Sequence, residues 1–203
     1  MLKELLKNKR FLKIISEYSK NPEILDIILF GSAVKGKEKP KDVDLLVIYD
    51  LKAKDISETS YKLRKNLEKV YRNIEITSKM YNEIFKPEFI ARESLLSEGY
   101  SLKNRKFLSE ALGYKSVILF KYSLKNMNKS ERMRFYYSLY GRKNEKGILD
   151  KTNSHKFAES IILSTIEGSD MIRNFLKKWN IENLEFPIIM PEKMLKHKIL
   201  NKD

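Results

Sequence analysis

Apolar residues in the first half of the chain alternate between helical spacing and short continuous runs. In residues 2–19 they recur three or four positions apart, which predicts an amphipathic helix. The runs that end at Phe30 and Tyr49 are short and apolar throughout, as buried strands are. The predicted order is helix 2–19, strand 24–30, strand 43–49, helix 57–71, strand 73–78 and helix 80–98, with a break at Pro87 and an end at Gly99.

The pattern changes after Asn104, where a second module is expected to begin. Its longest apolar segment predicts a strand, and Ser130 stands where it could cap a helix. The predicted elements are strand 114–124, helix 130–140, a basic loop at 141–147, a helix or strand at 157–166, helix 169–179 and strand 186–190. We therefore expect the α/β (α+β) class, with a first domain at residues 1–103 and a smaller α+β module at residues 104–203.

Two short motifs interrupt the apolar pattern of the first module. Gly31-Ser32 ends the run at 24–30, and Asp42 and Asp44 open the next apolar strand. Side chains alternate between the two faces of a strand, so both carboxylates point the same way. Carboxylates are poor core residues, but Mg²⁺ prefers their oxygens together with substrate phosphates. The two motifs therefore indicate a site for a metal ion and a phosphate group.

This succession of Gly31-Ser32 and Asp42-Val43-Asp44 resembles the nucleotidyltransferase superfamily typified by DNA polymerase β, in particular its minimal prokaryotic branch. The resemblance covers residues 5–103. It implies the nucleotidyltransferase fold, a short mixed sheet flanked by helices, with a third carboxylate on a later strand. Glu75, in the segment predicted as strand 73–78, is the residue that the resemblance implies for this position.

The resemblance also implies a reaction, in which AMP or CMP passes from ATP or CTP to an acceptor and pyrophosphate is released. The three carboxylates would bind Mg²⁺ or Mn²⁺, and Glu75 could also take the proton of the acceptor hydroxyl. The backbone N–H groups after Gly31, the Ser32 hydroxyl and the Lys35 ammonium would bind the triphosphate.

The chain is strongly basic, with a net charge of +14, which favours a polyanionic partner and most often a nucleic acid. Lysines alternate along the loop beside the proposed site, and a basic segment follows a tyrosine-rich helix. Lysine can also simply fill solvated faces, and aromatic residues at helical spacing are often core residues. We expect an RNA such as tRNA to be the acceptor, bound by Lys37, Lys39, Lys41, Arg142 and Lys143.

Composition also excludes several kinds of site. The chain has no cysteine, which excludes disulfides, thiolate metal sites and cysteine catalysis. The N-terminal residues are charged throughout, unlike a signal peptide, and no long uncharged apolar run is present. A cytoplasmic location is therefore expected.

Other functions remain open beside nucleotide transfer to RNA. Members of the minimal branch are paired with toxins, so a toxin–antitoxin role and AMP transfer to a protein partner are alternatives. A catalytically inactive binding module on the same fold is another. An aminoglycoside-modifying enzyme would need an acidic pocket for a cationic drug, and the charge of +14 argues against it.

Overall fold

The computed structural model describes residues 2–34, 42–143 and 145–195. The chain divides into two compact units, Met1–Leu112 and Gly113–Asp203. The first unit extends past residue 103, because short strands at 100–101 and 106–107 join its sheet. None of the described helices is long and apolar enough to cross a membrane.

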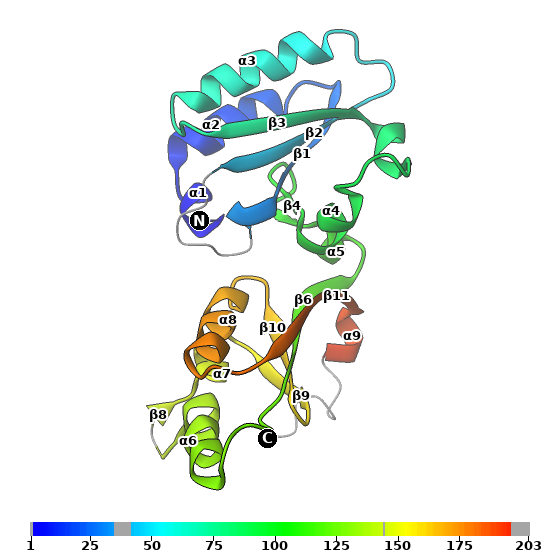
Figure 1. The fold of residues 1–203 in the computed structure, drawn as a ribbon. Coiled ribbons are helices and arrows are strands. Elements are labelled where there is room, and N and C mark those ends of the chain that lie inside the picture. The colour runs from blue at the N-terminus through cyan, green and yellow to red at the C-terminus, as the bar shows by residue number, and fades with distance from the viewer. Residues whose placement is uncertain (1, 35–41, 144, 196–203) are drawn as a thin grey trace. The chain divides into compact units, whose positions relative to one another are not determined.

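The first unit is a five-stranded mixed sheet with helices on both faces (Figure 1). The sheet order is β3-β2-β1-β4-β5, in which β2 and β3 are parallel and the other neighbours are antiparallel. Its elements are α1 (Leu2–Leu5), α2 (Lys9–Tyr18), β1 (Ile24–Phe30), η1 (Gly31–Ala33), β2 (Val43–Tyr49), α3 (Ile56–Glu68), β3 (Ile74–Met80), η2 (Tyr81–Phe85), α4 (Arg92–Glu98), β4 (Tyr100–Ser101), β5 (Lys106–Phe107) and α5 (Leu108–Ala111).

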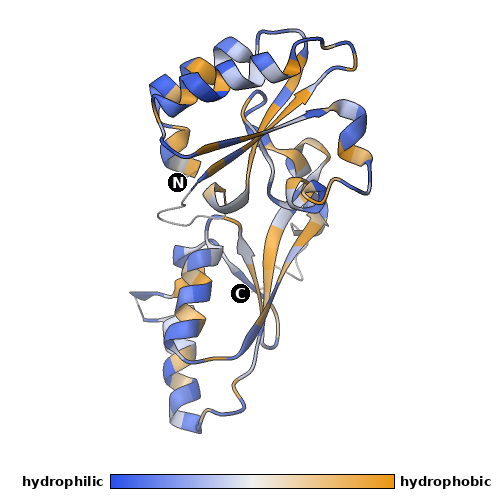
Figure 2. Ribbon diagram, turned by 45° about the horizontal axis from the view of Figure 1, so that its top comes forward, coloured by the Kyte–Doolittle hydropathy of each residue, from blue (hydrophilic) through white to orange (hydrophobic). Residues whose placement is uncertain are grey.

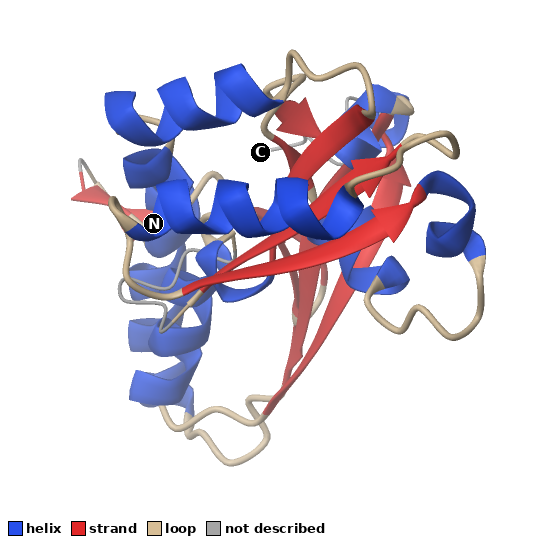
Figure 3. Ribbon diagram, turned by 90° about the horizontal axis from the view of Figure 1, so that it is seen from above, coloured by secondary structure: helices blue, strands red, loops and turns tan. Residues whose placement is uncertain are grey.

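Both faces of the first sheet are largely apolar, which explains why β1 and β2 are apolar at every position except Asp26 and Asp44 rather than alternating. Ile28, Leu46 and Ile48 share one face and pack with Phe89 and Leu95, the latter from α4. Helices α2 and α3 lie over the opposite face (Figures 1 and 3). Hydrophobic colour accordingly runs along the strands, and the helices alternate between hydrophobic and hydrophilic residues (Figure 2).

The predicted helix at 80–98 is confirmed in its last part, its break at Pro87 and its end at Gly99, but its first part is wrong. Residues up to Met80 belong to β3, a 3₁₀ turn follows, and α4 begins only at Arg92. Lys86 has an extended backbone, with φ −72° and ψ 141°. Steric conflict with the ring of Pro87 disfavours the helical conformation at the residue before it, so the chain cannot continue as a helix there.

The predicted helix at 2–19 is two helices. Asn8 stands between them and accepts hydrogen bonds through Oδ1 from the backbone N–H groups of Arg10 and Phe11, at 3.0 and 3.1 Å. This is the bonding of an N-cap, which starts α2 afresh at Lys9.

The second unit is an antiparallel four-stranded sheet with the order β11-β6-β10-β9, beside a small β7–β8 hairpin. A helical segment connects β6 to β9, and α8 connects β10 to β11, which is the ferredoxin-like β-α-β-β-α-β arrangement. Its elements are β6 (Tyr114–Tyr122), α6 (Lys129–Tyr140), β7 (Gly141–Arg142), β8 (Glu145–Lys146), α7 (Ile148–Lys151), β9 (His155–Ala158), β10 (Ile161–Thr165), α8 (Ser169–Lys178), β11 (Asn183–Pro191) and α9 (Glu192–Leu195).

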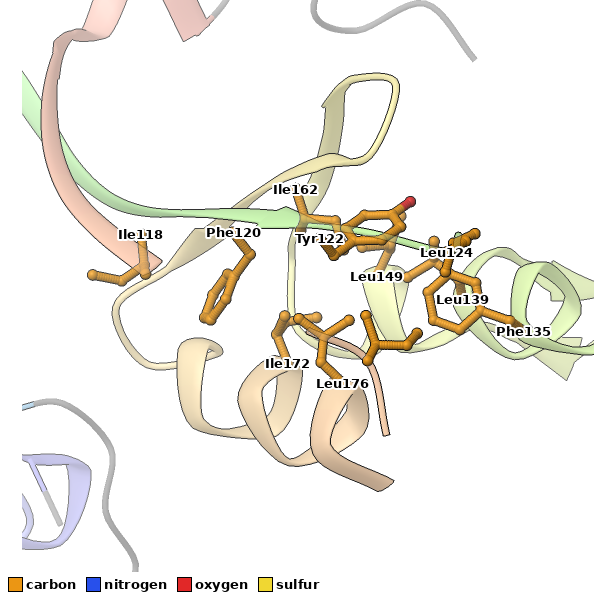
Figure 4. Packing of buried hydrophobic residues seen from close by; sticks show 11 residues of the cluster. Ile118, Phe120, Tyr122, Leu124, Phe135, Leu139, Leu149, Ile162, Ile172 and Leu176 are labelled. Atoms are coloured by element: carbon orange, nitrogen blue, oxygen red, sulfur yellow. The ribbon is translucent and has the colours of Figure 1, made fainter. Parts of the chain in front are cut away.

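The core of the second unit lies between this sheet and α6, α7 and α8 (Figure 4). Phe120 and Phe135 are fully buried. The Phe135 ring contacts the rings of Tyr122, Phe175 and Trp179, with centroid separations of 5.6, 5.4 and 5.7 Å. An aromatic residue of the tyrosine-rich helix is therefore a core residue and is not available to a ligand.

Three details of the second unit differ from the sequence prediction. The basic loop at 141–147 contains the β7–β8 hairpin, which begins at Gly141 with φ +95°. Residues 157–166 are not one element but the end of β9 and the whole of β10. Helix α6 is capped by Asn128, whose side chain accepts from the backbone N–H of Glu131, and not by Ser130.

Candidate functional site

Gly31 forms the turn between β1 and the short 3₁₀ helix η1. Its φ of +71° lies in the left-handed region that glycine adopts without steric cost. A methyl group added to its Cα would collide with Oδ2 of Asp44, closer than real Cβ atoms approach other atoms. The Gly-Ser turn therefore brings its backbone against the second aspartate of the Asp-x-Asp motif.

Strand register aligns Asp44 with its neighbours on both sides. Asp44 is the second residue of β2, and it pairs with Phe30 of β1 and with Glu75 of β3. Directly paired residues project to the same face of a sheet, so the register places Glu75 on the face of Asp44. Glu75 is exposed, whereas Asp44 is half-buried.

Asp42 stands immediately before β2 and is half-buried as well. The Ser32 hydroxyl donates a hydrogen bond to Asp42 Oδ1 at 3.4 Å. The hydroxyl of Ser32, a residue that the sequence predicts to bind phosphate, thus connects the Gly-Ser turn to the first aspartate. The structure thus joins Gly31, Ser32, Asp42 and Asp44 through two contacts.

The carboxylates act on one another electrostatically. Burial raises the pKa of Asp44, and the charges of Asp42 and Glu75 raise it further. Each of the two neighbours therefore lies close enough to disfavour the ionised form of Asp44. A cation placed among them would reverse this effect, because opposite charge favours ionisation.

No group of three His, Cys, Asp or Glu side chains among the described residues is arranged to hold a metal ion. Asp42 and Asp44 are the carboxylates that suit a hard cation, because they lie at one strand end beside the glycine turn. The exposed Glu75 is the third residue in register.

The remaining predicted residues are not among the described residues of the first unit. Lys35, Lys37, Lys39 and Lys41 lie outside the described residues. Arg142, in β7, and Lys143, after it, are exposed residues of the second unit.

Asp26 is a half-buried polar residue that the sequence interpretation passed over. It lies within β1, and its Oδ1 accepts from the Ser101 hydroxyl at 2.8 Å and from the Ile27 backbone N–H at 2.7 Å. Its Oδ2 accepts from the Asn104 side chain at 3.3 Å. A lone carboxylate inside an apolar run was the signal that could have identified it. Its partners attach the turn after β4 to β1.

A family model covers most of the first unit. Residues 12–106 match the family model described as "Polymerase beta, Nucleotidyltransferase". No match was found among curated proteins. A crystal structure of a mutant toxin–antitoxin complex, MntA-HpeT, aligns over 50% of this chain and 71% of that chain, with 13% identity and a TM-score of 0.34. The match to residues 12–106, together with the mixed sheet and the Gly-Ser turn against Asp44, identifies the first unit as a nucleotidyltransferase domain of the polymerase β-like superfamily.

Proposed function

We propose that this protein is a metal-dependent nucleotidyltransferase that moves AMP or CMP from ATP or CTP to an RNA acceptor such as tRNA. The observation that carries the proposal is the position of Asp44, which is aligned with Glu75, influenced by Asp42 and in contact range of the Gly31 turn. Nucleotidyl transfer needs positioned phosphates and neutralised negative charge rather than a covalent enzyme intermediate.

The carboxylates suit Mg²⁺ or Mn²⁺, which would polarise a phosphoryl oxygen and lower the pKa of a bound hydroxyl. Asp42 and Asp44 would hold the ion, since their mutual repulsion raises the pKa of Asp44 and a cation would relieve it. Glu75 would complete the ligand set and accept the proton of the acceptor hydroxyl. Its exposure leaves it accessible to an acceptor.

The Gly31 turn would receive the triphosphate. Without a side chain, Gly31 leaves room for the Asp44 carboxylate beside its backbone, and the Ser32 hydroxyl lies within the same turn. Lys35 would add a positive charge for the β- and γ-phosphates. These three roles follow from the resemblance to the superfamily and from the local chemistry of the turn.

An RNA acceptor is supported by the net charge of +14, which would attract a polyanion and raise its rate of association. Lys37, Lys39 and Lys41 would contact its phosphates near the site. AMP transfer to a protein, as part of a toxin–antitoxin system of the minimal branch, is the second candidate, because the superfamily match itself leaves the acceptor open.

The test is incubation with each α-labelled NTP, Mg²⁺ or Mn²⁺, and either total RNA or cell protein. We expect label in RNA with ATP or CTP. The variant Asp44→Asn should lower transfer at least about 100-fold, since the metal's contribution is worth several kcal/mol. Asp50→Asn is the matched control, because Asp50 directly follows the other end of β2.

Three outcomes decide the proposal. Label in protein instead of RNA would establish the second candidate. Transfer by Asp44→Asn at the parental rate would show that the site is wrongly assigned. No transfer by the parent protein to any acceptor, with any of the four NTPs, would favour the inactive binding module.

A further inference from the structure

The C-terminal turn of α6 combines exposed tyrosine rings with basic side chains. Tyr137 and Tyr140 are three residues apart on α6, so they lie on neighbouring positions of one helix face, and each is 40% exposed. Phe135, on the same helix, is fully buried. The helix thus divides its aromatic residues between the core and an outer face.

Two basic side chains from other elements lie over these two rings. The Arg142 guanidinium carbon, from β7, is 4.8 Å from the ring centroid of Tyr137. The Lys156 ammonium nitrogen, from β9, is 5.9 Å from the ring centroid of Tyr140. We name these four residues, Tyr137, Tyr140, Arg142 and Lys156, the tyrosine–basic surface.

Two tyrosines of the second unit hold the Tyr140 ring in place. Tyr136 stacks on it with a centroid separation of 5.8 Å and an interplanar angle of 20°. The Tyr140 hydroxyl is hydrogen-bonded to that of Tyr122, a core residue. A ring held in this way loses little conformational entropy when a ligand stacks on it.

The surroundings of the tyrosine–basic surface are positively charged. Lys143 and Lys146 are exposed on the same hairpin as Arg142. Basic residues outnumber acidic residues between positions 129 and 158. Such a patch favours a partner that carries regular negative charge.

The face of the second sheet away from the helices is less suited to nucleic acid. Leu119 of β6 pairs with Leu163 of β10 and with Phe186 of β11, so the three side chains form a row on the face away from the helices. The two central strands thus present aliphatic residues where RNA-binding sheets of this topology present aromatic ones. Aromatic residues and charge coincide at the end of α6 instead.

We propose that the tyrosine–basic surface binds single-stranded RNA. Bases stack on Tyr137 and Tyr140, and phosphates contact Arg142 and Lys156. Tyrosine rings accept any base by stacking, and arginine adds both a planar stacking partner and a phosphate contact. This inference rests on RNA as the acceptor in the proposed function, and it gives the second unit the role of holding that RNA.

The experiment measures binding of a fluorescent oligouridine to the full-length protein by anisotropy over a series of salt concentrations. The first variant, Tyr137→Leu with Tyr140→Leu, should weaken binding about tenfold or more, since each stacked base contributes substantially. The second, Arg142→Gln with Lys156→Gln, should lower the slope of log K against log salt by about 1.4, because each single-strand phosphate contact contributes about 0.7.

The chain provides a matched control on α3. The Lys65 ammonium lies 5.7 Å from the ring centroid of Tyr61, which is 60% exposed, so this pair has the same chemistry in the first unit. Tyr61→Leu with Lys65→Gln should leave RNA affinity unchanged. Fluorescence of Trp179, the sole tryptophan, checks that the second unit remains folded.

Each outcome has a definite meaning. Parental affinity and salt slope in the Arg142/Lys156 variant would overturn the proposal, as would equal weakening by the control. Arg142 and Lys156 are exposed, so their variant should remain folded and still tests the proposal if the tyrosine variant unfolds. Absence of RNA binding by the parent at low salt overturns it as well. Asp44→Asn should bind RNA normally, so loss of transfer alone concerns the active site and not this surface.

Discussion

Replacement of Gly31 by alanine tests whether the Gly-Ser turn and the Asp-x-Asp motif form one site. The structure predicts two separate costs for this single methyl group. The backbone at Gly31 has φ +71°, which alanine adopts poorly. The new Cβ would also collide with Oδ2 of Asp44 and lie 3.3 Å from its Cγ, so the carboxylate must move.

The size of the effect follows from these two costs. A left-handed backbone costs an alanine about 1–2 kcal/mol. Displacement of the Asp44 side chain from its preferred rotamer adds about 0.5–1.5 kcal/mol. We therefore expect Gly31→Ala to lower the free energy of unfolding of the first unit by about 2–3 kcal/mol. Transfer activity should fall by more than stability alone explains, because the displaced carboxylate is the proposed metal ligand.

Gly113 provides the matched control for backbone strain. Its φ is +76°, and an added Cβ would meet nothing within 4 Å. Gly113→Ala should therefore show the backbone cost of about 1–2 kcal/mol without the collision. Scanning calorimetry of the full-length protein gives both values, and Trp179 fluorescence identifies the transition of the second unit, which contains Gly113.

A double-mutant cycle isolates the collision. In an Asp44→Ala background the carboxylate is absent, so Gly31→Ala should cost only as much as Gly113→Ala. The reasoning would be refuted if Gly31→Ala had the same cost with and without the Asp44 carboxylate. It would also be refuted if Gly31→Ala retained the parental rate of nucleotide transfer.

Two further predictions concern carboxylates of the first sheet. Burial raises the pKa of Asp26 above its ordinary 3.8, so the stability that protonated Asp26 contributes is full below pH 3.8 and is lost as the pH rises through the folded-state pKa. Asp26→Asn does not ionise, so it should gain stability relative to the parent over that rise. Urea unfolding at a series of pH values measures this difference. The swap Glu75→Thr with Thr77→Glu keeps the amino-acid composition and the sheet face of the carboxylate but moves it about 6–7 Å along β3. Nucleotide transfer should therefore fall sharply in the labelled-NTP assay. A parental rate would remove Glu75 from the site.

The strands that carry the site could be predicted from sequence, because their signals are local. The largely apolar run at 24–30 ends before Gly31, and the run at 43–49 begins after Asp42. The structure has β1 and β2 with these bounds. Both strands are buried on both faces, so continuous hydrophobicity was sufficient. The first part of the helix predicted at 80–98 is not helical because Pro87 interrupts it, and Ile90, an apolar residue in this interruption, is 89% exposed.

The contacts within the site could not be predicted in the same way. The approach of Gly31 to Asp44 depends on the pairing of β1 with β2, and the alignment of Asp44 with Glu75 depends on the parallel pairing of β2 with β3. A shift of one residue in either register would move the side chains to the other face. The motif indicated which residues matter, whereas the register determines whether they meet.

Asp26 and Asp44 show how the surroundings of a half-buried carboxylate distinguish a structural role from a chemical one. Burial raises the pKa of both. At Asp26 the next influences come from Ser101, Ile27 and other groups that stabilise negative charge, so the protein satisfies this carboxylate itself. At Asp44 they are the carboxylates Asp42 and Glu75, which destabilise it further. Such a concentration of unneutralised charge lowers stability, and positive charge supplied from outside the chain would offset it, as divalent ions do in nucleotidyl transfer.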